Sequence, residues 1–327
     1  MSIYTESEHA VALTDTMRWI KHPPMTPEER YQYGRYHWRL KDYNEAFHWL
    51  SMALEDHVEA AWFDIGLGLT NDFFDLEICS QNTEILSETA ETDSVAADPE
   101  VCFRNAWRYY SDIAAPNSEE LFRKAWLLRR GLGTKADPEA ARLLFERIPE
   151  MYPNLTPEDF KIYCEYTVEG SDASAAADIC KLPIGDAFLE LATYKLDFIL
   201  KEMEKGSDTK NTDEKAAGRN QADQERIREG RLLLKKACDF HCEEALFLDY
   251  RLFGANFGKY EFQDEIRQLY SFRIGQYGRV CDIDPSRKAY LRMIRMYENG
   301  FPGDSPERRE DFARKAQKYY KKIEAMG

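Results

Sequence analysis

A helical periodicity that returns along almost the whole chain is the feature that most constrains its fold. Apolar residues recur at three- and four-residue spacing in the segments 29–40, 43–54, 121–130, 139–148, 188–203 and 226–238. This spacing places them on one face of an α-helix, whereas the alternation typical of strands is scarce. Proline stands near the expected helix starts, and glycine stands just after the expected ends. The sequence therefore predicts an all-α fold.

The expected helices group into pairs whose starts recur at intervals of about forty residues. After an N-terminal helix, we place helix hairpins at about 27–56, 58–113, 117–150, 157–181, 184–239, 243–280 and 285–326. A single pair cannot bury its own apolar face, but a stack of pairs can. The sequence thus predicts an α/α superhelical solenoid of about seven helix hairpins.

Three regions follow from this pattern. We expect an N-terminal capping helix over 1–26, a helical repeat solenoid over 27–283 and a basic C-terminal repeat or cap over 284–327. Two insertions, near 81–98 and 206–223, are polar and poor in large apolar residues. We expect both to be mobile surface loops.

Small and aromatic residues recur in four segments, 42–53, 61–66, 125–141 and 235–245. Gly34, Ala46 and Ala53 are expected to let neighbouring helix axes approach closely. In the third segment, two glycines permit a turn and Asp137 is expected to cap the next helix.

These segments resemble the Sel-one-like repeat, a relative of the tetratricopeptide repeat. The resemblance covers 30–68, 121–147 and 231–254 best, then 286–325, and His57 stands where the family usually has glycine. It implies a right-handed α/α superhelix that serves as an adaptor or assembly scaffold, with the first helix of each pair lining a concave surface. Such families share no catalytic residues.

The acidic charge is concentrated in one segment. The net charge is −15, and residues 42–103 contain fifteen Asp and Glu residues and no Lys or Arg, so that acids and bases balance elsewhere. This disfavours nucleic acid or an anionic membrane as a partner. The segment is either a solvated face or a dock for a basic partner. The basic C-terminal pair leaves self-association as a third alternative, through Arg308, Arg309, Arg314, Lys315, Lys318, Lys321 and Lys322.

No motif organises the chemically reactive residues into a known catalytic site. Cys238, His241 and Cys242 could supply metal ligands, but a second ligand cluster is missing. The segment 131–135 lacks the spacing of a phosphate-binding loop and follows a helix rather than a strand. We therefore expect no catalytic residues, no metal, no cofactor and no enzymatic activity.

The expected first helices carry the candidate binding residues. Aromatic residues favour binding hot spots, and helical spacing places Tyr31, Arg35 and Trp38 on one face, with Trp62 and Asp64 in the next pair. We expect a protein-protein interaction scaffold that binds a protein or peptide on its concave surface, the partner being of basic character. The alternative is an inhibitor or immunity-type protein whose acidic region blocks a basic active site.

Three features of the sequence predict where in the cell the protein lies. Residues 1–10 lack a basic start and an apolar signal core, and no apolar run approaches membrane-spanning length. The seven cysteines fall mostly among apolar helical positions, which suits reduced thiols. We expect a cytoplasmic protein without membrane insertion.

Overall fold

A computed structural model describes residues 26–39, 42–71, 98–160, 182–204, 220–240, 242–253, 287–299 and 306–326, with single positions between 267 and 281. Residues 1–25 of the expected N-terminal helix lie outside this set. So do most of the two expected loops, at 81–97 and 206–219. The second loop was predicted to end at residue 223, but Asn220 already caps a helix that begins at Gln221.

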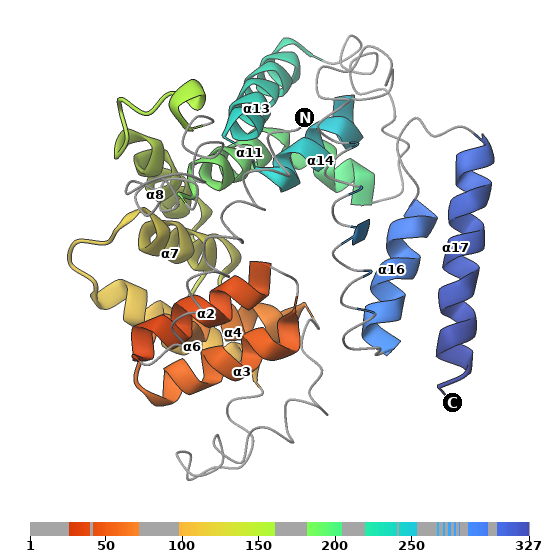
Figure 1. Ribbon diagram of the computed structural model, residues 1–327. Coiled ribbons are helices and arrows are strands. Elements are labelled where there is room, and N and C mark those ends of the chain that lie inside the picture. Colours follow the sequence, from red (N-terminus) through yellow and green to blue (C-terminus); the bar gives the residue numbers. More distant parts are fainter. Residues whose placement is uncertain are drawn as a thin grey trace. The chain divides into compact units, whose positions relative to one another are not determined.

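The described part of the chain folds into helices, which confirms the all-α prediction (Figure 1). In chain order they are α2 (Pro27–Arg39), α3 (Tyr43–Glu55), α4 (Ala61–Thr70), α6 (Pro99–Asp112), α7 (Ser118–Arg130), α8 (Pro138–Glu150), α11 (Ile184–Glu204), α13 (Gln221–Asp239), α14 (Glu243–Phe253), α16 (Arg287–Asn299) and α17 (Pro306–Glu324). None of these helices combines the length and hydropathy needed to cross a bilayer.

Side-chain caps fix several helix starts. Asn117 accepts a hydrogen bond from the backbone of Glu120, whose carboxylate accepts one in return from the Asn117 backbone, so the two form a capping box for α7. Asp98 and Asn220 cap α6 and α13 in the simpler form. Asp137 Oδ1 accepts from the Ala140 backbone at 3.0 Å, which confirms its expected role before α8. These local bonds satisfy backbone donors that a helix start leaves unpaired.

The described part of the chain divides into two compact units, and the division passes through α8 and α16. The first, called the N-terminal unit here, contains α2, α3, α4, α6 and α7. Within it α2 packs on α3, α3 on α4, α4 on α6, and α6 on α7. A Cβ atom on Gly34 would lie 2.9 Å from Leu50 Cγ, and one on Gly66 would lie 3.0 Å from a Phe103 ring carbon. Both glycines therefore seat a large side chain of the neighbouring helix, as expected for Gly34.

The second unit, called the C-terminal unit, contains α11, α13, α14, α17 and most of α16. Here α14 packs on both α11 and α13. Gly230 of α13 again seats a leucine, because its Cβ would lie 2.6 Å from Leu196 Cγ of α11. In α16 and α17, which run side by side in Figure 1, Tyr297 contacts the rings of Phe312 and Tyr319 at 5.5 and 6.1 Å.

Left-handed residues end two of the helices. Gly131 follows α7 with φ of 69°, and Gly133 follows with φ of 71°. This confirms that 131–135 is a turn between two helices. His57 holds the same left-handed conformation after α3, at φ of 67°. Its backbone donates to Leu54 O at 2.9 Å, and Val58 donates to Ala53 O at 2.9 Å. These two bonds form a Schellman motif, whose left-handed position usually holds glycine.

Replacing His57 by glycine should stabilise the protein. A residue with a Cβ atom pays a steric cost in the left-handed region that glycine avoids, so His57→Gly should raise the free energy of unfolding by about 1 kcal/mol. Urea denaturation followed by circular dichroism measures the change. His57→Ala is the control, because alanine keeps the Cβ atom and should not stabilise. Equal gains in both variants would contradict the assignment.

Candidate functional site

Three first helices of predicted pairs meet at one buried arginine in the N-terminal unit. Arg123 of α7 is 5% exposed and lies between Tyr31 of α2 and Asp64 of α4. Tyr110 of α6 closes the same site from the second helix of a pair. We call these four residues, together with Arg35 and Glu119, the Arg123 cluster.

The guanidinium group of Arg123 is bonded on several sides. Its Nη1 and Nη2 donate to Asp64 Oδ2 and Oδ1 at 3.0 and 3.1 Å, a bidentate contact. Nη1 also lies 2.8 Å from Tyr31 Oη and 3.0 Å from Tyr110 Oη. The Tyr31 hydroxyl in turn donates to Asp64 Oδ2 at 3.0 Å. Since burying a charge is costly unless it is paired and hydrogen-bonded, these contacts are what allow Arg123 to lie inside.

A second ion pair balances the charges of the cluster. Glu119 lies 2.8 Å from Arg123 Nη2, and its two oxygens lie 2.6 and 2.9 Å from the guanidinium nitrogens of Arg35. Two guanidinium groups thus face two carboxylates. Burial would raise the pKa of Glu119, but Arg123 and Arg35 outweigh it and lower that pKa to about 2. Burial raises the pKa of the Tyr110 hydroxyl, so this phenol stays protonated at neutral pH.

The structure brings three of the five predicted binding residues into this cluster. Tyr31 and Asp64 are 5% and 8% exposed, so most of their surface faces the protein interior rather than a groove. The side chain of Arg35 is 21% exposed. Trp38 and Trp62 are partly buried and pack against the core around Leu50 and Ile65. The surface candidates are therefore Arg35, Trp38 and Trp62, whereas Tyr31 and Asp64 hold helices together.

Sequence reasoning did not single out Arg123, Tyr110 or Glu119. Their partners lie far away in the chain: Arg123 is 92 residues from Tyr31 and 59 from Asp64. Within α7, Arg123 stands next to Lys124, and such a pair of basic residues is typical of the solvated face of a helix. No local signal distinguishes a buried arginine from an exposed one, so only the tertiary contacts reveal it.

Carboxylates gather where the N-terminal ends of α2, α4 and α7 meet beside the cluster. Glu28 lies one turn before Tyr31, Glu59 lies just before α4, and Glu120 lies in the first turn of α7. We call these three residues the acidic rim. Burial raises the pKa of the Tyr109 hydroxyl, and the rim carboxylates raise it further because all three lie near that ring. Acidic side chains at helix N-termini are favoured by the helix dipole, so the rim also stabilises its helices.

Several other acids of the segment 42–103 are paired within the protein. Asp56 forms an ion pair with Arg30, Asp42 lies 3.1 Å from His37 Nδ1, and Glu100 lies 3.4 Å from Arg104. Asp64 belongs to the Arg123 cluster. In the described part of this segment, Glu45 and Glu59 are among the acids with exposed side chains.

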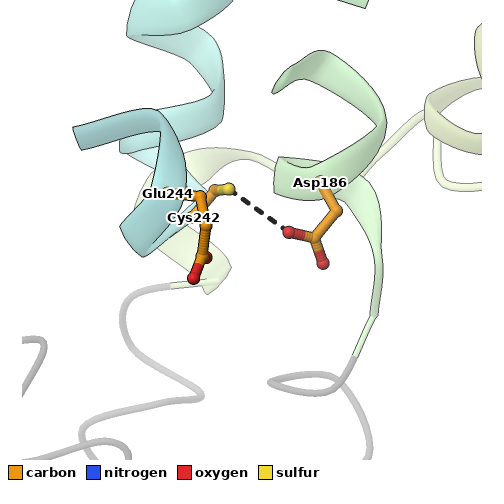
Figure 2. A group of neighbouring side chains, drawn as sticks. All are labelled: Asp186, Cys242 and Glu244. Carbon is orange, nitrogen blue, oxygen red and sulfur yellow. Dashed lines mark hydrogen bonds between the residues drawn. The ribbon is translucent and has the colours of Figure 1, made fainter. Parts of the chain in front are cut away.

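A separate group of possible metal ligands lies in the C-terminal unit. Asp186 of α11 and Cys242 and Glu244 at the start of α14 place their ligand atoms within 4.8 Å of one another. Figure 2 shows the Cys242 thiol directed toward Asp186, to whose Oδ1 it donates at 3.2 Å. Burial and the two carboxylates raise the pKa of this thiol well above its ordinary value. Only the thiolate ligates a metal, so a cation would have to displace this proton.

This group differs from the ligand set weighed from the sequence. Cys242 is common to both, whereas Asp186 comes from a helix 56 residues earlier in the chain. His241 lies outside the described residues, and Cys238 is buried. One sulfur and two carboxylates could hold a divalent cation only with water or another group completing its coordination.

Comparisons of the chain with protein-family models, with curated proteins and with solved structures find no match.

Removing the charge of Arg123 should strongly destabilise the N-terminal unit. Arg123→Met leaves Asp64 buried without its cation, so the free energy of unfolding should fall by about 3–5 kcal/mol. Urea denaturation provides the measurement, and Arg123→Lys, which keeps the charge but loses the bidentate contact, should lose less. Arg104→Ala removes an exposed ion pair and should cost about 0.5 kcal/mol or less. Similar losses for Arg123→Met and Arg104→Ala would contradict the assigned role.

Glu119 should make stability depend on pH in the acid range. Its pKa is lowered from 4.5 to about 2 in the folded protein, so its contribution is complete above pH 4.5 and is lost as the pH falls toward 2. The loss should be on the order of 1 kcal/mol between about pH 5 and pH 3, allowing for solvent screening. Glu119→Gln should therefore show a shallower decline of urea midpoints with falling pH. The exposed control Glu150→Gln should follow the wild type.

Proposed function

We propose that this protein is a non-enzymatic helical scaffold that binds a protein or peptide partner on the side lined by the first helices of its pairs. The observation that carries the proposal is the Arg123 cluster, which joins α2, α4 and α7. These are the first helices of three successive predicted pairs. First helices that lie side by side are what an α/α superhelix requires of its inner surface. The finer arrangement, a superhelical solenoid of about seven hairpins related to the Sel-one-like repeats, is part of the proposal.

The chemistry of the reactive groups also favours binding over catalysis. A catalytic base or nucleophile needs a pKa matched to its task and access to a substrate. The buried acid and phenols of the Arg123 cluster instead accept hydrogen bonds from Arg123, and the Tyr31 hydroxyl donates one to Asp64. Burial raises the pKa of the Cys102 thiol to about 12, so this thiol is protonated and unreactive at neutral pH. The groups of the N-terminal unit whose pKa values are strongly shifted thus contribute to packing.

Aromatic and acidic groups would select the partner. Trp38 and Trp62 are partly exposed at the edge of the core, and aromatic residues in such positions favour interface hot spots. Exposed carboxylates such as Glu45 and Glu59 would steer a basic protein or peptide toward them. The same charge supports the alternative function, an inhibitor whose acidic region occludes a basic active site. A partner whose enzymatic activity disappears in the complex would favour the inhibitor.

Affinity capture from lysate of the native cells, quantified by mass spectrometry, tests the scaffold. We expect a partner whose capture weakens at high salt and in the variant Glu45→Lys/Glu59→Lys. Charges at the edge of an interface govern the association rate and its dependence on salt. Trp38→Leu/Trp62→Leu should weaken it further, by about thirtyfold if each ring carries part of a hot spot. The control Glu150→Lys/Glu225→Lys makes the same charge change outside the acidic segment. A partner set that is identical for all variants would contradict the proposal.

A further inference from the structure

The outer face of α17 carries a basic surface whose opposite side is already packed. Phe312 and Ala316 of α17 are buried, and the ring of Tyr319 contacts Tyr290 and Tyr297 of α16. By helical spacing, Arg314, Lys318 and Lys321 share the opposite side, and all three are exposed. We call these three residues the basic face of α17.

The helix dipole alone does not explain the basic face of α17. From Phe312 to Ile323 the chain has five Lys and Arg residues and no acid. The helix dipole favours cations in the last turn, which accounts for Lys321. It does not account for Arg314 or Lys318, which lie further from the end of the helix at Glu324. Asp311 forms ion pairs with Lys315 at 2.8 Å and with Arg314 at 3.6 Å, at the border of the basic face.

The same chain carries a surface of opposite charge. Glu28 and Glu59 of the acidic rim are exposed. Glu28 and Glu120 lie about one turn before Tyr31 and Arg123, whose side chains bond each other in the Arg123 cluster. Glu59 belongs to the segment 42–103, whose sequence has fifteen acids and no Lys or Arg. The two surfaces belong to different compact units.

We propose that the basic face of α17 docks onto the acidic rim of a second copy of the chain. Each copy would then present one positively charged and one negatively charged surface. The contact is therefore head-to-tail rather than the isologous contact of a symmetric dimer. The inference rests on the proposed function in one respect, because it takes the acidic surface to be a docking surface. It goes further by naming the partner as the chain itself.

The expected association is weak and sensitive to salt. Exposed ion pairs contribute little individually, and the net charge of −15 makes copies repel one another outside the specific contact. Raising ionic strength from about 0.01 M to about 0.5 M shortens the screening length several-fold. We therefore expect self-association at low salt that disappears at high salt.

Sedimentation velocity on the purified full chain tests the proposal with a charge swap. At about 0.01 M salt the average mass should rise with concentration. Arg314→Glu/Lys318→Glu/Lys321→Glu and Glu28→Lys/Glu59→Lys should each weaken association by about tenfold or more. An equimolar mixture of the two variants should restore it, because each retains a face that complements the other. Circular dichroism verifies that both variants are folded.

A control variant separates the specific contact from net charge. Lys135→Glu/Arg147→Glu/Arg228→Glu makes the same charge change at exposed positions outside α17, and it should retain more association than the α17 variant. A chain that stays monomeric at low salt, or two variants that stay monomeric when mixed, would overturn the inference. Salt-dependent capture of a different protein in that case would leave the proposed scaffold function standing. Binding of the monomeric chain to anionic vesicles through α17 would also overturn the inference.

Discussion

The buried pairing of Arg123 with Asp64 is the interaction on which the N-terminal unit depends. A guanidinium group is tolerated in a protein interior only when its donors meet acceptors of matching geometry. Here two carboxylates and two phenols supply those acceptors, and they come from α2, α4, α6 and α7. The helices must therefore hold one relative arrangement, because a shift of any of them would leave a charge buried without its partner.

Local signals in the sequence were enough to find the helices. Hydrophobic periodicity, caps such as Asp137 and glycines such as Gly131 act within a few residues, so α3, α7, α8 and α13 begin or end close to where the sequence predicts. The close approach expected at Gly34 is also present, and it joins α2 to Leu50 of the following helix. His57 shows that the left-handed turn after α3 forms even at a residue that carries a Cβ atom.

The site could be predicted only in part, because its contacts are long-range. Helical spacing places Tyr31 and Arg35 on one face, with Asp64 expected in the next pair. The structure brings all three into the Arg123 cluster, where Tyr31 and Asp64 are buried and the Arg35 side chain is 21% exposed. Helical spacing tells which residues share a side and does not tell whether that side meets solvent or another helix. The group of possible metal ligands also depends on a long-range contact, because Asp186 reaches Cys242 only through the packing of α11 on α14.

The salt bridge between Arg35 and Glu119 bears on how the N-terminal unit loses its structure. In a simple repeat array each pair touches only its neighbours, so the ends can fray while the middle persists. Arg35 and Glu119 instead connect the first helix of one predicted pair with that of the pair two positions later, 84 residues on. If α2 alone detached, Glu119 would lose its ion pair with Arg35, and Arg123 would lose its contact with Tyr31. The helices that supply the Arg123 cluster, α2, α4, α6 and α7, should consequently unfold as one cooperative block.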